Sequence, residues 1–400
     1  MLMRGNRNYS VVARYPIFMP KVLYYGSSTQ IHSGACQWMF RLADGMRDYG
    51  YETIAVLPDD DGIVEWYADA GIETRYRFSE PVRARRSLFG QLRFVFLALL
   101  AAVRLAITIR REDIDIIHVN EVTYPQGLLG ARLGGAKTVC HVRASYESRI
   151  VRQVFAITAV FLAHEVICVS ERTRTRLFDH TGISTNKVSV VHDGVPSPEE
   201  FSSDTGADSF RRQLDISQSS FLIIMVSKLI AIKGHMRLVA AAKRLEEKYN
   251  NIEIAIVGGE VDKHEKYAEN LRTATDSVES VHLVGFYPNI VEAFSGADVV
   301  VHVPAYEDPF PGVVLEGMLA GNPVVGARTG GIPEQIEDGE TGLLVAPEND
   351  PEELATALTR LYEDDDLRTR LGERAGTRVR ERFPVQDHFD AIEKVYKQIQ

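Results

Sequence analysis

The sequence predicts an α/β protein made of two doubly wound, parallel-sheet domains that face each other across a cleft. The chain has 400 residues, which is long for one hydrophobic core and suits two domains of ordinary size. Short β-branched runs alternate with longer amphipathic runs along its whole length, which is typical of βαβ units. A polar, acidic stretch with two prolines, 196–208, interrupts this alternation and has the composition of an interdomain linker.

In the first half, the β-branched runs predict strands separated by helices. These strands are 21–25, 53–57, 114–119, 137–142, 166–170 and 188–191. The stretch 34–49 places Trp38, Leu42 and Met46 on one face at the spacing of an amphipathic helix.

The second half repeats the alternation and ends in helices. Its predicted strands are 221–226, 252–257, 281–284, 298–303, 323–326 and 343–345. Asp350 followed by Pro351 has the pattern of a helix N-cap with proline at the first helical position. We therefore expect a leader (1–19), a first domain (20–196), a linker (197–215), a second domain (216–380) and a last helix (381–400) that could cross back to the first domain.

Charge and cysteine usage exclude several classes of protein. The formal net charge of -10 argues against nucleic acid as a partner, since that needs a basic face. The three cysteines are far apart and form neither a disulfide framework nor a zinc motif, so we expect the reducing cytoplasm. The opening residues lack the apolar core of a signal peptide. The longest apolar runs, 94–103 and 154–163, are half the roughly 20 residues that span a bilayer, so we expect no membrane-spanning helix.

The segment 226–235 (VSKLIAIKGH) is the first candidate binding site. It follows a strand, carries Lys228 and Lys233, and ends at a glycine before a helix. The free N–H groups and the dipole of a helix N-terminus favour an anion, so the two lysines could flank a diphosphate there. The alternative is two surface lysines in a loop.

The segment 304–321 (PAYEDPFPGVVLEGMLAG) is the strongest candidate. A strand leads into Glu307 and Asp308, a Pro-Phe-Pro-Gly turn follows, and the next helix carries Glu316. Carboxylates in a cleft accept hydrogen bonds from sugar or ribose hydroxyls, so Asp308 and Glu316 could hold both ends of a nucleotide sugar. The alternative is that Asp308 only caps the helix and that Glu316 is solvated.

The segment 321–334 (GNPVVGARTGGIPE) contains two consecutive glycines after a buried strand. Gly330 and Gly331 permit a close approach of the backbone to a ligand. For these glycines alone, a plain turn is the preferred interpretation.

Together these segments resemble the nucleotide-sugar half of the family 4 retaining glycosyltransferases, which have the GT-B fold of two Rossmann-like domains. The residues that correspond to the family pattern are Lys228, Lys233, Gly234, Asp308, Glu316, 317–325 and 330–334. In the first half, 166–171 and 191–196 are similar to the segments that close the family's N-terminal domain, and 33–35 (Ser-Gly-Ala), with Gly34, is similar to its first glycine-rich loop.

The chain departs from the family pattern at three positions. Lys228 stands where the family usually has arginine, which replaces a bidentate fork by a point charge. Asp308 is one methylene shorter than the usual glutamate, and Glu307 beside it could take that position. Pro311 replaces a glycine and has no backbone N–H, while Gly312 follows one position later.

The resemblance implies transfer of a sugar, with retention, from a nucleoside-diphosphate sugar to a hydroxyl acceptor in polysaccharide, glycolipid or lipid-linked glycan assembly. It implies catalytic roles for Asp308, His141 and Lys233, with His141 over the donor sugar. The implied substrate-binding residues are Gly34, Lys228, Lys233, Glu307, Phe310, Gly312 and Glu316. A structural role is the alternative for His141, and the roles of His118 and Asn120 stay open. We expect no cofactor and no obligatory metal, because the acidic run 59–61 is better explained as a solvated turn.

Other functions are conceivable on the same fold. A dinucleotide-dependent oxidoreductase is disfavoured, because 27–34 contains one glycine rather than a Gly-x-Gly-x-x-Gly pattern. A non-hydrolysing sugar-nucleotide epimerase and a catalytically silent sugar-nucleotide-binding subunit remain alternatives. The acid spacing favours transfer over epimerisation, and the three residues Lys233, Asp308 and Glu316 favour an active enzyme.

The stretch 75–112 is basic in an otherwise acidic chain. It holds nine arginines against two glutamates, a local charge of +7, with phenylalanines interspersed. This composition suits a segment that docks on an anionic membrane, which would place the protein on the inner face of the cell membrane. The alternative is an ordinary core helix, 91–109, flanked by solvated arginines.

Overall fold

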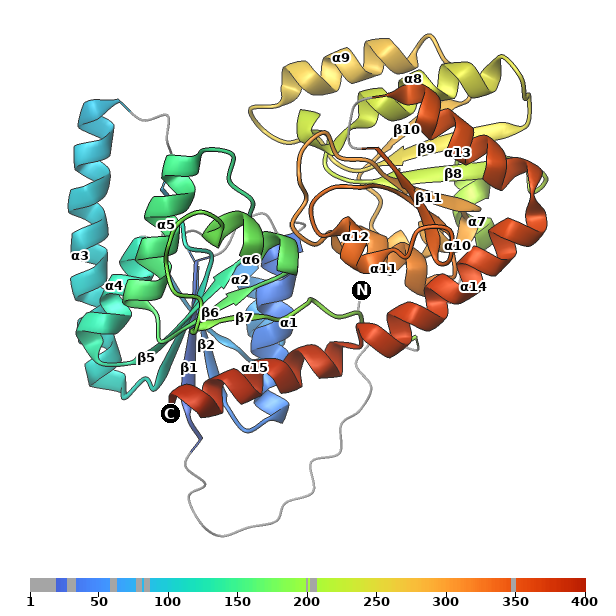
Figure 1. Cartoon of the computed structure of the whole chain (residues 1–400). Helices are drawn as coiled ribbons and strands as arrows, with labels where there is room; N and C mark the ends of the chain where they lie inside the picture. Colours follow the sequence, from blue (N-terminus) through green and yellow to red (C-terminus); the bar gives the residue numbers. More distant parts are fainter. Residues whose placement is uncertain are drawn as a thin grey trace.

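The computed structural model describes residues 19–26, 34–57, 63–76, 81–82, 87–198, 201, 207–346 and 350–400. It contains two parallel sheets, one in each half of the chain (Figure 1). The first has seven strands in the order β3-β2-β1-β4-β5-β6-β7, and the second has six in the order β10-β9-β8-β11-β12-β13. The order reverses direction beside the first strand of each half, so both sheets are doubly wound, as predicted.

The predicted strands of the first half form within two residues of their expected ends. The first sheet contains β1 (Lys21–Tyr25), β2 (Glu52–Leu57), β3 (Glu73–Tyr76), β4 (Ile116–Asn120), β5 (Lys137–Val142), β6 (Glu165–Cys168) and β7 (Val188–Val190). Only β3 was not predicted. It is four residues long, lies at the sheet edge and begins with three polar residues, so it lacks the apolar run of the inner strands.

Helices cover both faces of this sheet. They are α1 (Gly34–Asp48), α2 (Ile63–Asp69), α3 (Leu88–Glu112), α4 (Pro125–Gly134), α5 (Arg149–Leu162) and α6 (Glu171–Phe178). Side chains of α3, α4, α5 and α6 share one hydrophobic cluster with the sheet, and those of α1 and α2 share the cluster on its other face.

The second half forms one continuous core around its sheet. Its strands are β8 (Phe221–Val226), β9 (Ile252–Val257), β10 (Val281–Gly285), β11 (Val299–His302), β12 (Val324–Ala327) and β13 (Gly342–Val345). Its helices are α7 (Ala207–Gln213), a 3₁₀ turn η1 (Ala231–Lys233), α8 (His235–Glu246), α9 (Glu265–Thr275), α10 (Ile290–Gly296), α11 (Gly312–Leu319), α12 (Ile332–Gln335), α13 (Pro351–Glu363) and α14 (Asp365–Arg382). As predicted, Asp350 caps α13, with Pro351 in its first turn.

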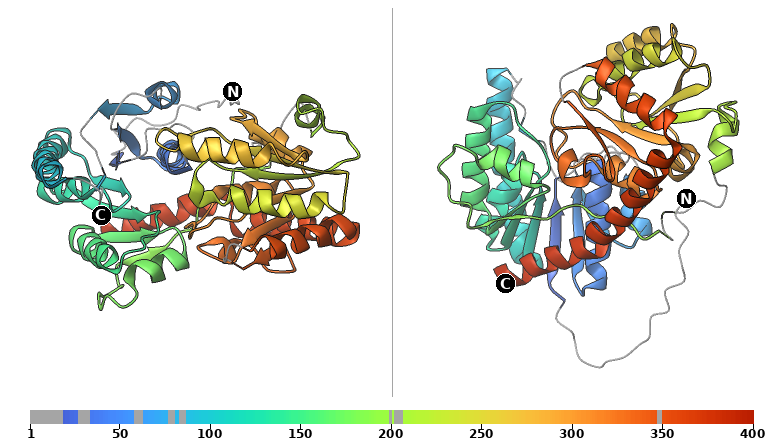
Figure 2. Two further views of the ribbon diagram at one scale, coloured as in Figure 1. Left: turned by 90° about the horizontal axis from the view of Figure 1, so that it is seen from above. Right: turned by 45° about the vertical axis from the view of Figure 1, so that its right-hand side comes forward.

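The last helix, α15 (Val385–Ile399), leaves the second half and packs on the first sheet (Figures 1 and 2). Ile392, Val395 and Tyr396 join the same hydrophobic cluster as α1 and α2. Where α15 begins, Val195 and Pro384 form a parallel bridge, so the two segments that connect the halves lie side by side.

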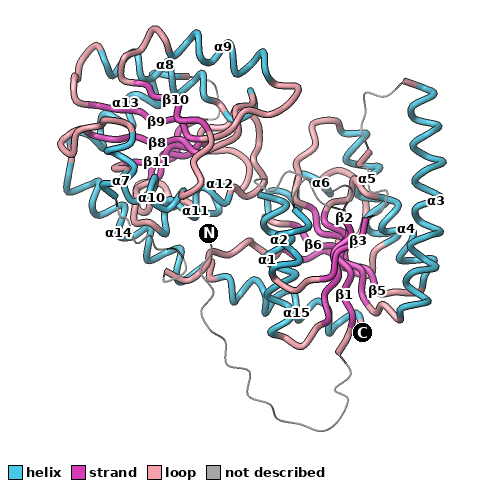
Figure 3. Tube along the Cα trace, turned by 180° about the vertical axis from the view of Figure 1, so that it is seen from behind, coloured by secondary structure: helices cyan, strands magenta, loops and turns pink. Residues whose placement is uncertain are grey.

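Helix α3 is neither a fully buried core helix nor a solvated one. It lies along the outer side of the first half and packs against α4 (Figure 3). In the described part of the chain, Phe89–Glu112 is the one segment long and apolar enough to cross a membrane by length and composition, although only 33% of its most apolar window is buried. The length of the apolar run 94–103 was therefore misleading, because Arg93 and Arg104 bound that run within one 25-residue helix.

Several sequence predictions lie outside the described residues. These are most of the leader, Ser33 of the Ser-Gly-Ala loop, the acidic run 59–61, part of the linker, and Arg77, Arg83, Arg85 and Arg86 of the basic stretch.

Candidate active site

The turn after β8 brings Lys233 against the end of β11. Gly234 closes η1 with a φ of 84°, and a Cβ there would lie 2.0 Å from the Val303 carbonyl oxygen. The Ala305 N–H donates to the Ile232 carbonyl oxygen at 2.9 Å, which joins the two loops. The glycine predicted before the helix is thus required for this close approach.

Asp308 lies at the meeting point of these loops. Its Oδ2 accepts from Lys233 Nζ at 2.6 Å and lies 3.2 Å from His302 Nε2. Burial acts to raise the pKa of the Asp308 carboxyl, but the Lys233 ammonium and the His302 hydrogen bond outweigh it and lower that pKa. Asp308 is therefore a carboxylate paired with the lysine expected to hold a diphosphate.

The alternative role for Asp308, capping the next helix, is wrong. The N-cap of α11 is Pro311, and no side chain caps this helix. The neighbouring acid, Glu307, points elsewhere, since it pairs with Arg172 and Arg176 of α6. Of the two acids at the first acidic position, Asp308 is the one beside Lys233.

The two consecutive glycines, Gly330 and Gly331, pack against the backbone of the Asp308 loop. The Gly331 N–H donates to the Asp308 carbonyl oxygen at 2.9 Å. A Cβ on Gly330, whose φ is +60°, would lie 2.0 Å from that oxygen, and one on Gly331 would lie 2.0 Å from the Pro309 carbonyl oxygen. Their close approach is therefore to the chain's own backbone at the base of the site.

Glu316 is partly buried on α11 and is not simply solvated. Burial raises the pKa of its carboxyl, and the positive charge of Arg41 on α1 partly offsets this. Arg41 in turn lies over the Trp38 ring, 5.3 Å from its centroid. A Cβ on Gly312 would lie 3.9 Å from Trp38 Nε1, so the start of α11 faces α1 of the first half.

The other two predicted binding residues of the second half are partly or largely covered. Lys228 is half-buried, and burial followed by the charge of Lys233 lowers the pKa of its ammonium. Phe310 is only 6% exposed, because its ring stacks on His192 at 4.9 Å between centroids and meets Phe383.

The carboxyl edges of the two sheets are joined by Glu334 on α12. Its carboxylate accepts from the backbone N–H groups of Glu171 and Arg172 at 2.9 and 2.8 Å, and from His192 Nε2 at 2.9 Å. The carboxylate thus sits at the N-terminus of α6, where the helix dipole favours a negative charge. The resembling segments 166–171, 191–196 and 330–334 meet at this contact.

His141 belongs to a buried cluster in the first half. Its Nδ1 lies 3.1 Å from His118 Nε2, and His118 Nδ1 lies 2.8 Å from the Tyr396 hydroxyl on α15. Burial, followed by the charge of Arg143, lowers the pKa of His118 to about 3 and also lowers the pKa of His141 well below its ordinary value, so both rings are neutral. His141 Nε2 is buried without a hydrogen-bond partner, which leaves one ring nitrogen available. Gly34, the remaining predicted residue, is exposed at the start of α1.

Sequence reasoning missed several residues at this junction. His302, at the end of β11, pairs with Asp308, while Arg172, Arg176 and His192 contact the second half from the first. No local pattern marks them, since each acts on a partner distant in sequence. Among the residues that the structure describes, no group of three or more His, Cys, Asp or Glu side chains could hold a metal ion.

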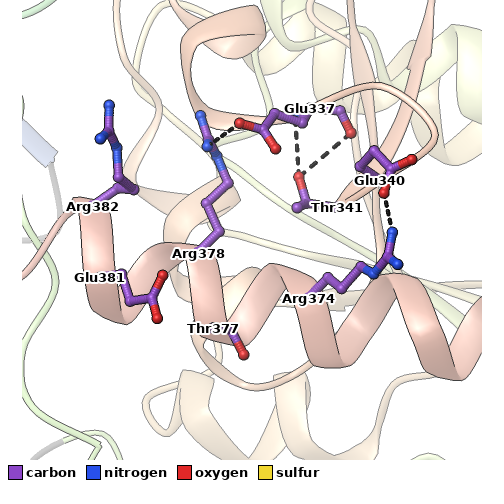
Figure 4. A pocket seen from close by; sticks show the side chains of 8 residues that line it. All are labelled: Glu337, Glu340, Thr341, Arg374, Thr377, Arg378, Glu381 and Arg382. Atoms are coloured by element: carbon purple, nitrogen blue, oxygen red, sulfur yellow. Dashed lines mark hydrogen bonds and ion pairs between the residues drawn. The ribbon is translucent and has the colours of Figure 1, made fainter.

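A separate surface hollow lies away from Lys233 and Asp308. Figure 4 shows it between α14 and the loop after α12, with Arg374 and Arg378 paired to Glu340 and Glu337. Its three arginines are matched in number by three glutamates, so the hollow has no net positive charge for a diphosphate.

Comparison with known proteins follows the same division into halves. Residues 33–197 match the family described as Glycosyltransferase Family 4, and residues 207–378 match the family described as Glycosyl transferases group 1. A D-inositol 3-phosphate glycosyltransferase of Corynebacterium jeikeium is 32% identical over 204 residues, which cover 49% of this chain and 48% of the relative. The chain thus spans about half the length of the curated relatives of this kind that it matches.

Two further comparisons cover more of the chain. An uncharacterized glycosyltransferase of Methanocaldococcus jannaschii is 26% identical over 71% of both chains. HepE of Anabaena, solved with UDP and glucose, superposes with a TM-score of 0.82 at 22% identity over 95% of this chain and 100% of its own. This likeness shows a shared two-domain GT-B fold.

Proposed function

Because this chain belongs to the family described as Glycosyl transferases group 1 and Glycosyltransferase Family 4, we propose that it transfers a sugar from a nucleoside-diphosphate sugar to a hydroxyl acceptor with retention of configuration. The acceptor would be a growing glycan, a glycolipid or a lipid-linked glycan. In this reaction the bond from the anomeric carbon to the diphosphate breaks, and the acceptor oxygen bonds to that carbon on the same face. The acceptor proton passes to an oxygen of the departing diphosphate.

One observation carries the proposal: Lys233, Asp308 and His302 meet at the carboxyl edge of the second sheet, next to the start of α11. The Lys233 ammonium and the free N–H groups at Gly312 and Val313 suit a diphosphate whose negative charge grows as the sugar leaves. Asp308 suits a sugar hydroxyl. Glu316, the fifth residue of α11, suits the ribose hydroxyls.

The Lys233–Asp308 pair has a consequence for donor binding. Without a donor, the ammonium is held by the carboxylate at 2.6 Å. A diphosphate would share this ammonium, and a sugar hydroxyl would then donate to the Asp308 carboxylate. Donor binding would therefore add a contact between the diphosphate and the Lys233 ammonium and a contact between a sugar hydroxyl and the Asp308 carboxylate, with little movement of either side chain.

We also propose that the protein works in the cytoplasm. The support is chemical: Cys36, Cys140 and Cys168 are all buried and none of them forms a disulfide, which suits a reducing compartment. UDP and GDP sugars are both candidate donors. HepE was solved with UDP-glucose, which makes UDP the first nucleotide to test.

The test is calorimetry of UDP and GDP with the unmodified protein, Lys233→Ala and Lys243→Ala. Lys243 is an exposed lysine on the next helix and serves as the control. A charge-assisted contact is worth about 1.5–3 kcal/mol, so Lys233→Ala should weaken nucleoside-diphosphate binding at least tenfold and slow transfer by as much or more. Lys243→Ala should change neither. Equal affinities for all three proteins, or no binding of either nucleotide, would overturn the proposal.

A further inference from the structure

Exposed apolar side chains gather on one layer of helices. Of the sixteen large hydrophobic side chains that are exposed in the described part of the chain, twelve lie on α3, α4 and α5. They are Phe89, Leu92, Val95, Phe96, Leu99, Val103, Ile107, Leu133, Ile150, Val154, Ile157 and Phe161. We call these twelve side chains the docking face. Such a concentration exceeds the scattered apolar residues of an ordinary surface.

The spacing shows that these side chains form stripes. On α3, Phe89, Leu92, Phe96, Leu99, Val103 and Ile107 recur every three or four residues, and on α5 Ile150, Val154, Ile157 and Phe161 do the same. The opposite sides of both helices pack into the first sheet's cluster, through Leu105 and Ile109 on α3 and Phe155 and Ala159 on α5. Figure 3 shows α3, α4 and α5 on the same side of the first sheet. Because α4 contacts both other helices, we assign the stripes of α3 and α5 to one outer surface.

Positive charge dominates the helices of the docking face. Helices α3, α4 and α5 contain seven arginines and one acidic residue, Glu112 at the end of α3, although the chain's formal net charge is -10. Arg93, Arg104 and Arg149 are exposed beside the stripes. An apolar surface rimmed by arginines matches the boundary between acyl chains and anionic headgroups.

The topology puts two of the most exposed side chains of this face on the side of the candidate site. Helices α3 and α5 follow β3 and β5, so both begin at the carboxyl edge of the sheet, the edge that meets Glu334 and Glu307. Phe89 is 79% exposed and Ile150 75% exposed, and each lies in the first turn of its helix, while Phe161, 80% exposed, lies in the last turn of α5. A bilayer that covered this face would reach the edge of the first sheet that meets the second half.

We propose that the docking face lies in the headgroup–acyl boundary of an anionic membrane and that the acceptor is presented there by a lipid. The acceptor part rests on the proposed glycosyl transfer, whereas the docking does not. Helix α3 does not span the bilayer, since one side packs along α4 within the domain. A symmetric contact with a second copy would set the same arginines against each other, whereas anionic lipid neutralises them.

The test is sedimentation with vesicles of phosphatidylglycerol and phosphatidylcholine, or of phosphatidylcholine alone, at low and high salt. The unmodified protein should partition at least tenfold more onto the anionic vesicles at low salt, and less at high salt because of screening. Two variants remove apolar side chains from separate helices, Phe89→Ser/Leu92→Ser/Phe96→Ser on α3 and Ile150→Ser/Ile157→Ser on α5. Each should lower binding to anionic vesicles at least tenfold.

Charge is tested separately with a matched pair of variants. Arg93→Ser/Arg104→Ser should abolish the preference for anionic vesicles, while Arg360→Ser/Arg370→Ser, which removes two exposed arginines of α13 and α14, should retain it. Calorimetry with UDP or GDP in the absence of lipid shows whether each variant is folded and binds the nucleotide. A failure of the proposed donor binding is therefore distinguished from a failure of membrane docking. The docking proposal is overturned if the unmodified protein stays in the supernatant, if the apolar variants sediment like it, or if light scattering shows a dimer that the α3 variant dissociates.

Discussion

Replacing Glu334 by Gln should loosen the contact between the two halves. The carboxylate accepts three hydrogen bonds from the first half, two from backbone N–H groups and one from His192. A glutamine retains one oxygen, but an NH₂ group replaces the other. This NH₂ group is itself a donor and cannot accept a hydrogen bond from the donor that the carboxylate oxygen had bound. The substitution therefore removes at least one hydrogen bond and the negative charge from the N-terminus of α6.

The size of the effect follows from these contacts. A hydrogen bond to a charged group is worth about 1.5–3 kcal/mol and a neutral one about 0.5–1.5 kcal/mol. The Glu334 side chain is 21% exposed, so screening by solvent is limited. A loss of about 2–3 kcal/mol is expected, which corresponds to roughly 30- to 150-fold in the ratio of joined to separated halves.

Small-angle scattering measures this ratio as a change in radius of gyration, and steady-state kinetics measure its effect on turnover. Glu337→Gln is the matched control, because Glu337 lies three residues away and pairs with Arg378 inside the second half. We expect a larger radius and slower transfer for Glu334→Gln and no change for Glu337→Gln. Identical scattering and kinetics for both variants would refute the role of Glu334 as the link between the halves.

The same carboxylate gives a pH dependence with a defined sign. Burial acts to raise the pKa of Glu334, but the hydrogen bonds from His192 and from the α6 backbone lower it. When a contact lowers the pKa of a carboxyl group, the contact is fully stabilised at a pH above the ordinary pKa of that group. The stabilisation is lost as the pH falls from the ordinary pKa through the lowered one. The unmodified protein should therefore expand only in acid, below the ordinary carboxyl pKa of about 4.3, and Glu334→Gln should lack this transition.

Three further outcomes test the site. Glu316→Gln should weaken binding of the free nucleoside diphosphate in calorimetry, whereas Asp308→Asn should impair use of the whole sugar nucleotide more; the reverse order would exchange their assigned partners. Transfer should persist in excess chelator, and a loss that magnesium or manganese restores would contradict the expected independence from metal. Gly330→Ala should melt several degrees below Gly339→Ala: both glycines have positive φ, but only at Gly330 would a Cβ meet backbone, 2.0 Å from the Asp308 oxygen. Each kcal/mol of lost stability lowers the melting temperature by about 2–4 °C in a domain of this size. Equal melting temperatures would mean that the Asp308 loop moves to accommodate the added Cβ.

The regular part of the fold was predictable because inner strands of parallel sheets are buried on both faces and so appear as continuous apolar runs. The run 221–226 is an example, and β8 has those same bounds. Strand β3 escaped prediction because an edge strand needs no such run. Domain boundaries and the individual roles of the site residues stay predictions.

For the candidate site, residue types and spacing predicted which side chains matter but not their partners. The spacing of Asp308 and Glu316 singled out both acids. It could not show that Glu307 forms an ion pair with Arg172, whereas Asp308 forms one with Lys233. The docking face was predicted only in part, through the basic and apolar composition of 75–112, and its contribution from α5 was missed for a related reason. Composition shows that α3 is apolar and basic, whereas its burial depends on what packs against it, and only tertiary structure shows an uncovered side.

The path of α15 has a consequence for the order in which the protein folds during synthesis. The core of the first half includes Ile392, Val395 and Tyr396, which are translated after the whole second half. A ribosome that has completed the seven strands of the first sheet has therefore not yet made the helix that covers part of one face. Domains generally fold as units as they emerge. We expect the second half to reach its native state first, while apolar surface of the first half stays exposed until α15 is made. Chaperones should bind the nascent chain at that stage.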